Sequence, residues 1–139
     1  MSWFGRKEAD PELVVKVARE AETLYRSGAM HCAEAVLAAI RNNFAQAVPE
    51  SVVFMASGFG GGSQTGCICG AVSGGTAGIG LVLGDDRKKT MKLTKSLHEW
   101  FISQYGVTCC RVVRGENKGV CPELTGRVAG KIAELLQSQ

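Results

Sequence analysis

The sequence predicts an all-α protein, a compact single-domain bundle of five or more helices around a glycine-rich central helix. Apolar residues recur at helical spacing in several stretches, and no long stretch alternates apolar and polar residues as a strand does. Glycine or proline marks most of the boundaries between these stretches. With 139 residues, 45% of them hydrophobic, the chain can bury one core, so residues 1–139 are expected to form one domain.

The N-terminal half is expected to hold two helices and a short third segment. Asp10 is a typical N-cap and Pro11 fits the first helical position, so a helix is expected from there until Gly28. A second helix is expected over about 31–46, where apolar residues again recur every three or four positions. Pro49 begins a short segment, PESVVFMAS, and the loop GFGGGSQTG follows it.

The stretch CGAVSGGTAGIGLVLG is expected to be the buried central helix. Glycines 70, 74 and 78 fall on one face, which lets neighbouring backbones approach closely. Glycine is a poor helix former, so the surrounding packing must hold this helix together.

Three further elements are expected in the C-terminal half. The apolar spacing over Lys88–Tyr105 predicts an amphipathic helix, which Gly106 ends. The segment TCCRVVRG is expected to form a turn or short helix. The last helix is expected to begin after Cys121, with Pro122 in its first turn.

Composition excludes several classes of function and directs attention to the cysteines. The net charge of +3 is spread over the chain, no five like charges adjoin and aromatic residues are only 6%, so nucleic-acid binding is not expected. The N-terminus lacks the apolar region of a secretory signal, and the longest apolar run is shorter than the ~20 residues of a membrane helix. We therefore expect a cytoplasmic protein without membrane insertion. Thiols stay reduced there, so six cysteines predict redox or metal chemistry rather than structural disulfides.

The glycine-rich loop resembles a dinucleotide-binding fingerprint only in part. Ser63 stands where G-x-G-x-x-G needs its third glycine, and the chain lacks alternating strands and helices. Two interpretations stay open: a tight turn beside a packed helix, and a loop whose amides line a reactive or cluster site. Under the second interpretation the glycines that contact the bound group are Gly58, Gly60, Gly61 and Gly70.

Four predicted helix starts each carry a cysteine: Cys32, Cys69, the pair Cys109 and Cys110, and Cys121. None forms Cys-x-x-Cys, which argues against a thioredoxin-like pair and a zinc ribbon. Unpaired N–H groups and a partial positive charge at a helix start stabilise a thiolate, so converging starts would form one electropositive pocket lined by sulfur. The alternative is that each cysteine packs as a small hydrophobe, and Cys32 also belongs to an apolar stripe. His31 is either polar surface or a ligand or proton donor beside Cys32.

Four segments together resemble a known family: YRSGAMHCAEAVLAAI, GFGGGSQTGCICGAVSGGTAGIGL, TCCRVV and VCPELTGRVAGKIAEL. The chain is similar to the redox-active family called C-GCAxxG-C-C from about residue 13 onward. The resemblance implies that the hallmark cysteines are Cys32, Cys69, Cys110 and Cys121. It makes Cys67 and Cys109 extras. The family is also similar to a domain of split-Soret cytochromes, which implies electron carriage and an iron–sulfur centre.

Three functions follow as hypotheses. In a thiol-dependent oxidoreductase, a low-pKa Cys69 would attack a disulfide and Cys110 or Cys32 would resolve the mixed disulfide. In an electron carrier, the four hallmark cysteines would bind an iron–sulfur cluster or another metal. In a non-catalytic binding or assembly module, the cysteines would only pack. A redox partner is expected, which the sequence does not identify, and the chain is also a candidate homodimer.

Overall fold

The computed structural model describes residues 8–116 and 119–139 and confirms the predicted all-α class. Helices account for 75% of the structure, and the described residues contain no strand. The elements in order are α1 (Pro11–Arg26), α2 (Cys32–Phe44), η1 (Glu50–Ala56), η2 (Gly62–Gly66), α3 (Gly70–Leu83), α4 (Arg87–Tyr105), α5 (Cys110–Arg114) and α6 (Cys121–Gln137).

Local capping explains the helix boundaries. The Asp10 carboxylate accepts a hydrogen bond from the Glu12 N–H at 2.9 Å, as expected of an N-cap before Pro11. The Asp86 carboxylate likewise accepts a hydrogen bond from the Lys89 N–H at 3.1 Å, as the N-cap of α4. Gly106, with φ +86°, ends that helix in a conformation that favours glycine.

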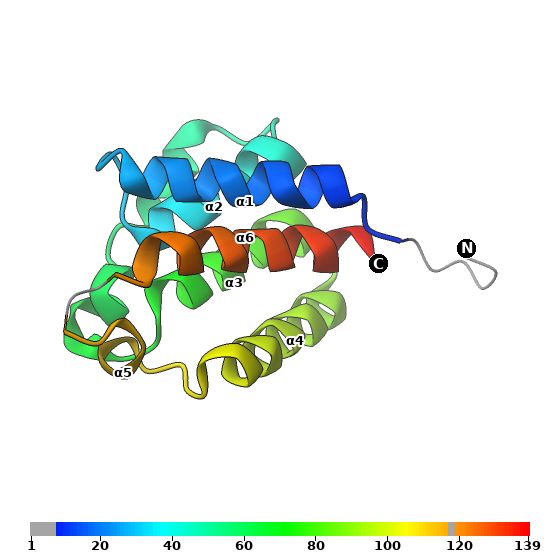
Figure 1. Cartoon of the computed structure of the whole chain (residues 1–139). Coiled ribbons are helices and arrows are strands. Elements are labelled where there is room, and N and C mark those ends of the chain that lie inside the picture. Colours follow the sequence, from blue (N-terminus) through cyan, green and yellow to red (C-terminus); the bar gives the residue numbers. More distant parts are fainter. Residues whose placement is uncertain (1–7, 117–118) are drawn as a thin grey trace.

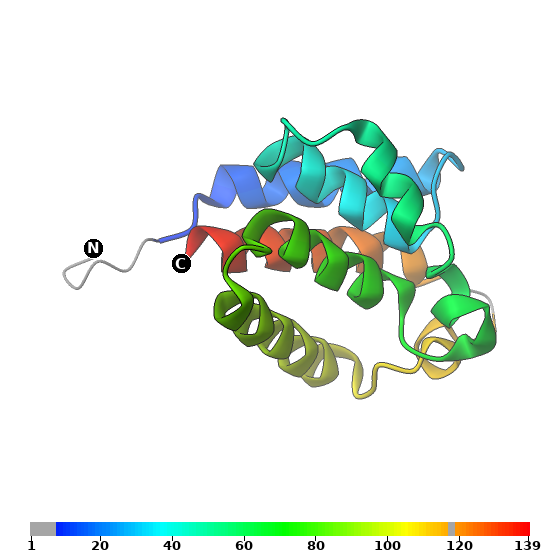
Figure 2. The same cartoon turned by 180° about the vertical axis from the view of Figure 1, so that it is seen from behind.

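α3 is the central helix, as predicted. It contacts α2, α4 and α6, while α1 packs against α2 and α6 (Figures 1 and 2). α1 and α6 lie side by side and run in opposite directions (Figure 1). The largest fully buried side chains come from these helices and include Val36, Ile40, Val72, Ile79, Leu97, Phe101, Val128 and Ile132.

Glycines let α2 and α3 approach to backbone contact. A methyl group on Gly74 would lie 2.3 Å from the carbonyl oxygen of Ala33, and one on Gly78 would lie 3.3 Å from Ile40 Cβ. Both neighbours belong to α2, so the predicted glycine face is confirmed. On another side of α3, a methyl group on Gly75 would lie 2.5 Å from Ile132 Cδ1 of α6.

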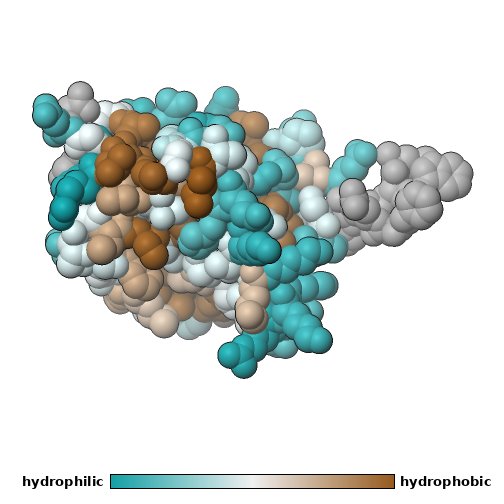
Figure 3. Space-filling view, turned by 90° about the horizontal axis from the view of Figure 1, so that it is seen from below, coloured by the Kyte–Doolittle hydropathy of each residue, from teal (hydrophilic) through white to brown (hydrophobic). Residues whose placement is uncertain are grey.

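One end of the bundle gathers several helix starts. α2, α3 and α6 all begin at the end that also holds η2 and α5 (Figures 1 and 2). We call this the cysteine end. Hydrophobic surface is prominent there when the molecule is seen from below (Figure 3). The segments at this end expose Ile68 by 46% and Val112 by 65%. Among the described residues, none of the helices has the length and hydropathy required to cross a membrane.

Candidate functional site

Every cysteine except Cys67 lies at a helix start, as the sequence predicts. Cys32, Cys110 and Cys121 are the first residues of α2, α5 and α6. Cys69 immediately precedes α3, and Cys109 immediately precedes α5. All six cysteines are free of disulfide bonds.

Four of these cysteines lie at the cysteine end of the bundle, near enough for the charge of one to affect another. A methyl group on Gly70 would lie 2.6 Å from Cys32 Sγ, so the start of α3 touches the sulfur at the start of α2. A negative charge on Cys121 or Cys110 would raise the pKa of Cys32, and a charge on Cys32 or Cys110 would raise that of Cys69. We call Cys32, Cys69, Cys110 and Cys121 the thiol cluster.

A short backbone bridge joins two cysteine-containing segments. Ile68 and Cys109 form an isolated antiparallel bridge, and the Cys69 N–H donates to the Thr108 carbonyl at 2.7 Å. The Cys110 N–H donates to the carbonyl of Cys67 in the same bridge. This pairing brings the starts of α3 and α5 together although they lie about 40 residues apart in the chain.

The two cysteines outside the thiol cluster have different surroundings. Cys67 is exposed, and the Cys109 S–H donates to the Gly66 carbonyl at 3.3 Å. Any reagent from solution therefore meets Cys67 before it meets the buried members of the cluster, and a reactivity experiment must remove this background.

The glycine-rich loop forms a left-handed turn against the cluster. Four consecutive residues, Gly61, Gly62, Ser63 and Gln64, have φ between 58° and 65°. The Gly61 N–H donates a hydrogen bond to the Cys32 thiol, which supports the interpretation that loop amides line a reactive site. Gln64 Nε2 closes the turn by donating to the Gly60 carbonyl at 2.7 Å.

The other glycines expected at the site have different places. A methyl group on Gly60 would lie 3.2 Å from His31 Cβ, so Gly60 allows the loop to pack on the start of α2. Gly58 is exposed and has no atom near its missing side chain, so no contact of that position with the cluster is observed. Gly62 was missed by the sequence analysis; a methyl group there would lie 2.7 Å from Cys110 Cβ.

Burial outweighs the helix amides in setting the thiol pKa values. Burial raises the pKa of Cys69 to about 12, although the N–H groups of Ala71 and Val72 donate to its sulfur and lower it. Burial likewise raises the pKa of Cys32 to about 11 against the N–H groups of Ala33 and Gly61. The expectation of a low-pKa Cys69 is therefore wrong: a site with 6% exposure loses more hydration of the thiolate than two amides restore.

Tyr25 is a member of the site that the sequence analysis missed. Its hydroxyl and the Cys121 thiol share a hydrogen bond. Burial, followed by the charges that Cys121 and Cys32 would carry as thiolates, raises the pKa of Tyr25 to about 12. The phenol is therefore protonated at neutral pH. Its position seven residues before Cys32, across the loop between α1 and α2, is the sequence signal that could have identified it.

The thiol cluster does not fit a preformed metal site. Within the part of the chain that the structure describes, no group of three or more His, Cys, Asp or Glu side chains is arranged to hold a metal ion. His31, weighed as a ligand, is the exposed N-cap residue of α2, where its N–H is paired with the Glu34 carboxylate at 3.2 Å. We therefore assign no metal to these residues.

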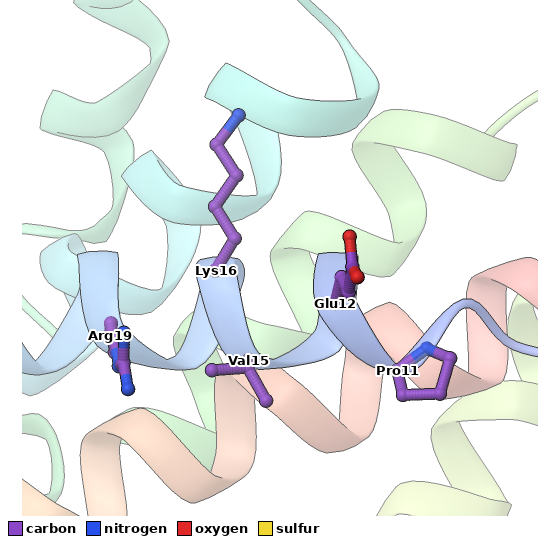
Figure 4. A pocket seen from close by; sticks show the side chains of 5 residues that line it. All are labelled: Pro11, Glu12, Val15, Lys16 and Arg19. Atoms are coloured by element: carbon purple, nitrogen blue, oxygen red, sulfur yellow. The ribbon is translucent and has the colours of Figure 1, made fainter.

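One surface depression, of about 520 Å³, lies away from the thiol cluster. Its lining residues all come from α1, and their side chains spread over one exposed side of that helix (Figure 4). A smaller depression of about 360 Å³ lies at the cysteine end, between the start of α2, η2 and α5. The smaller depression adjoins the thiol cluster, because its lining includes His31 and Arg111, the chain neighbours of Cys32 and Cys110.

The family model C_GCAxxG_C_C, described as putative redox-active protein, matches residues 30–135. The chain belongs to this family. The match includes all four members of the thiol cluster and begins after Tyr25. No curated protein and no solved structure is significantly similar to the chain.

Proposed function

We propose that the protein is a thiol–disulfide oxidoreductase that exchanges two electrons with a substrate disulfide through the thiol cluster. The observation that carries the proposal is that four free cysteines lie at four helix starts at one end of the bundle and that their charges affect one another. Membership in a redox-active family supports it. Packing alone would explain the buried Cys69 and Cys110, but Cys32 and Cys121 both remain partly exposed.

We assign the attacking role to Cys32 and the resolving role to Cys121. Cys32 is partly exposed and receives two backbone N–H groups, whereas Cys69 is nearly inaccessible. Of the neighbouring thiolates, Cys121 has the largest effect on the pKa of Cys32. Cys69 is the second choice for the resolving thiol, because Cys32 is the neighbour that affects its pKa most.

The exchange balances as two successive displacements. The Cys32 thiolate attacks one sulfur of the substrate disulfide, whose S–S bond breaks, and the departing thiolate takes up the proton that Cys32 released. Cys121 then attacks the Cys32 sulfur, and the second substrate thiol leaves with the proton of Cys121. Two electrons and two protons thus pass from the protein to the substrate, and a Cys32–Cys121 disulfide forms.

The raised pKa of Cys32 sets the expected rate of this exchange. With a pKa of about 11, only about one molecule in 10⁴ carries the Cys32 thiolate at pH 7. A thiolate whose pKa is 2–3 units higher is about tenfold more nucleophilic. This gain offsets only part of the loss in rate that the small thiolate fraction causes. The rate is therefore expected to rise about tenfold per pH unit from pH 7 to 10.

The test uses the Cys67→Ser/Cys109→Ser protein and the neutral disulfide 4,4′-dithiodipyridine. We expect both halves of the probe to be released and mass spectrometry to find a Cys32–Cys121 disulfide. In the matched variant that also carries Cys121→Ser, half of the probe stays bound to Cys32. Tyr25→Phe should slow the second displacement without slowing the first, because Tyr25 contacts Cys121.

Two results would refute this function. If the cluster reacts only after the protein is unfolded, its cysteines serve packing. If anaerobically purified protein contains iron and acid-labile sulfide in stoichiometric amounts and its thiols resist the probe, the electron-carrier hypothesis replaces the proposal.

A further inference from the structure

A polar pocket adjoins the thiol cluster, and its walls come from three elements of the cysteine end. Its volume is about 360 Å³, within the lower range of small-molecule sites. It is lined by His31 ahead of α2, by Gly61 and residues 64–66 of the left-handed turn, and by Arg111 and Arg114 of α5.

The charge of this pocket has one sign. Arg111 and Arg114 are three residues apart in α5 and so share a face of the helix. None of the residues that line the pocket is acidic. Glu34 is the acidic residue closest to His31 in the sequence, and its carboxylate accepts a hydrogen bond from the backbone N–H of His31. Within the described residues, neither guanidinium takes part in a salt bridge.

Glycines shape the wall around one guanidinium. Arg111 Nη2 donates to the Thr65 carbonyl at 3.0 Å, which fixes the side chain against the turn. A methyl group on Gly66 would lie 2.9 Å from Arg111 Nε, and Gly66 has φ +74°. Only glycine fits this position without strain or a clash, so the turn leaves room for the arginine.

The pocket and the thiol cluster share a wall. Gly61 lines the pocket, and its N–H donates to Cys32. Arg111 directly follows Cys110 in α5, and His31 directly precedes Cys32 in the chain. Residues next in the chain to Cys32 and Cys110 therefore line the pocket on two sides.

We propose that this pocket binds a carboxylate of a low-molecular-weight disulfide and so selects anionic substrates for the thiol cluster. The inference rests on the proposed function. Guanidinium groups bind carboxylates through paired, charge-assisted hydrogen bonds, and a volume of about 360 Å³ admits a small molecule rather than a folded partner.

The test compares two disulfide probes on the Cys67→Ser/Cys109→Ser protein. One is 5,5′-dithiobis(2-nitrobenzoate), which carries a carboxylate on each half, and the other is the neutral 4,4′-dithiodipyridine. Arg114→Gln should lower the rate with the anionic probe about tenfold relative to the neutral probe. The matched control Arg87→Gln makes the same charge change at the exposed start of α4, at the opposite end of the bundle (Figure 1), and should leave the ratio unchanged.

A second measurement does not depend on thiol chemistry. The non-reactive anion 4-nitrobenzoate should shift the amide NMR signals of Gly61, Thr65 and Gly66 in the reduced protein, and Arg114→Gln should abolish these shifts. Failure of both probes to react with the folded protein refutes the redox function, while the NMR titration still tests the pocket. Unchanged amide signals together with an unchanged rate ratio in Arg114→Gln overturn the pocket assignment. Tighter binding of inorganic phosphate than of 4-nitrobenzoate would overturn the carboxylate as the ligand group.

Discussion

The contact between α2 and α3 makes Gly74→Ala the most informative change in the fold. The new methyl group would lie 2.3 Å from the Ala33 carbonyl oxygen and 2.7 Å from its Cα. Contacts below 3.0 Å are essentially never seen for a real Cβ, so the two backbones must separate by at least about 0.7 Å at this point. Neither opposing atom is a side-chain atom that could rotate away.

The matched control is Gly80→Ala in the same helix. No atom lies within 4 Å of a methyl group at Gly80, so alanine gains about 0.8–1 kcal/mol of helix propensity there without a clash. Gly74→Ala gains the same propensity but carries an overpacking cost of about 1–3 kcal/mol or somewhat more. The difference in unfolding free energy between the two variants isolates the steric cost, which we expect near the upper end of that range.

Urea denaturation of the reduced proteins, followed by circular dichroism, measures this difference. We expect Gly80→Ala to be more stable than the parent and Gly74→Ala to be less stable than Gly80→Ala by about 3 kcal/mol. Equal stability of the two variants would show that α2 and α3 are not in backbone contact at Ala33. The account of how Cys32 and Cys69 are brought together would then lose its basis.

Two further predictions concern the site. Burial raises the pKa of Cys69 to about 12 and that of Cys32 to about 11, so the thiols of the unfolded chain ionise at lower pH than those of the folded protein. The unfolding free energy should therefore stay constant below about pH 8.5. Above that pH it should fall by up to about 1.4 kcal/mol per pH unit for each thiol. Urea denaturation from pH 7 to 11 tests this, and Cys69→Ala should make the decline shallower; a flat profile would contradict the buried neutral thiols. Ser63 has φ 58°, a conformation that glycine adopts more easily than serine, so Ser63→Gly should raise the unfolding free energy by about 0.5–1 kcal/mol. The control Ser57→Gly changes a residue with φ −61° and should lower the unfolding free energy. Equal effects of the two changes would refute the left-handed turn.

Local signals in the sequence predict the helix starts and the glycine face well. Asp10 and Pro11 mark the start of α1, and glycines at positions 70, 74 and 78 repeat at the spacing that α2 contacts. These features depend on residues a few positions apart, so single-sequence reasoning can recognise them.

The chemistry of the site depends on burial, which local patterns do not specify. A cysteine before a helix, such as Cys69, is typical of a low-pKa thiol only where water also reaches it. Its 6% exposure results from packing among α2, α3, α5 and the bridge to Thr108, all distant in sequence. Tyr25 was missed for the same reason. The left-handed turn was partly predictable from its glycines, but Ser63 and Gln64 adopt that conformation against their own preference.

The order in which the ribosome delivers the chain has a consequence for this arrangement. Tyr25 and Cys32 leave the exit tunnel long before Cys121, whose helix α6 follows them in the chain and packs against α1. Until that helix docks, the earlier sulfurs lack the neighbours that shield them. A newly made chain is therefore more open to oxidative mispairing of its cysteines than the finished protein.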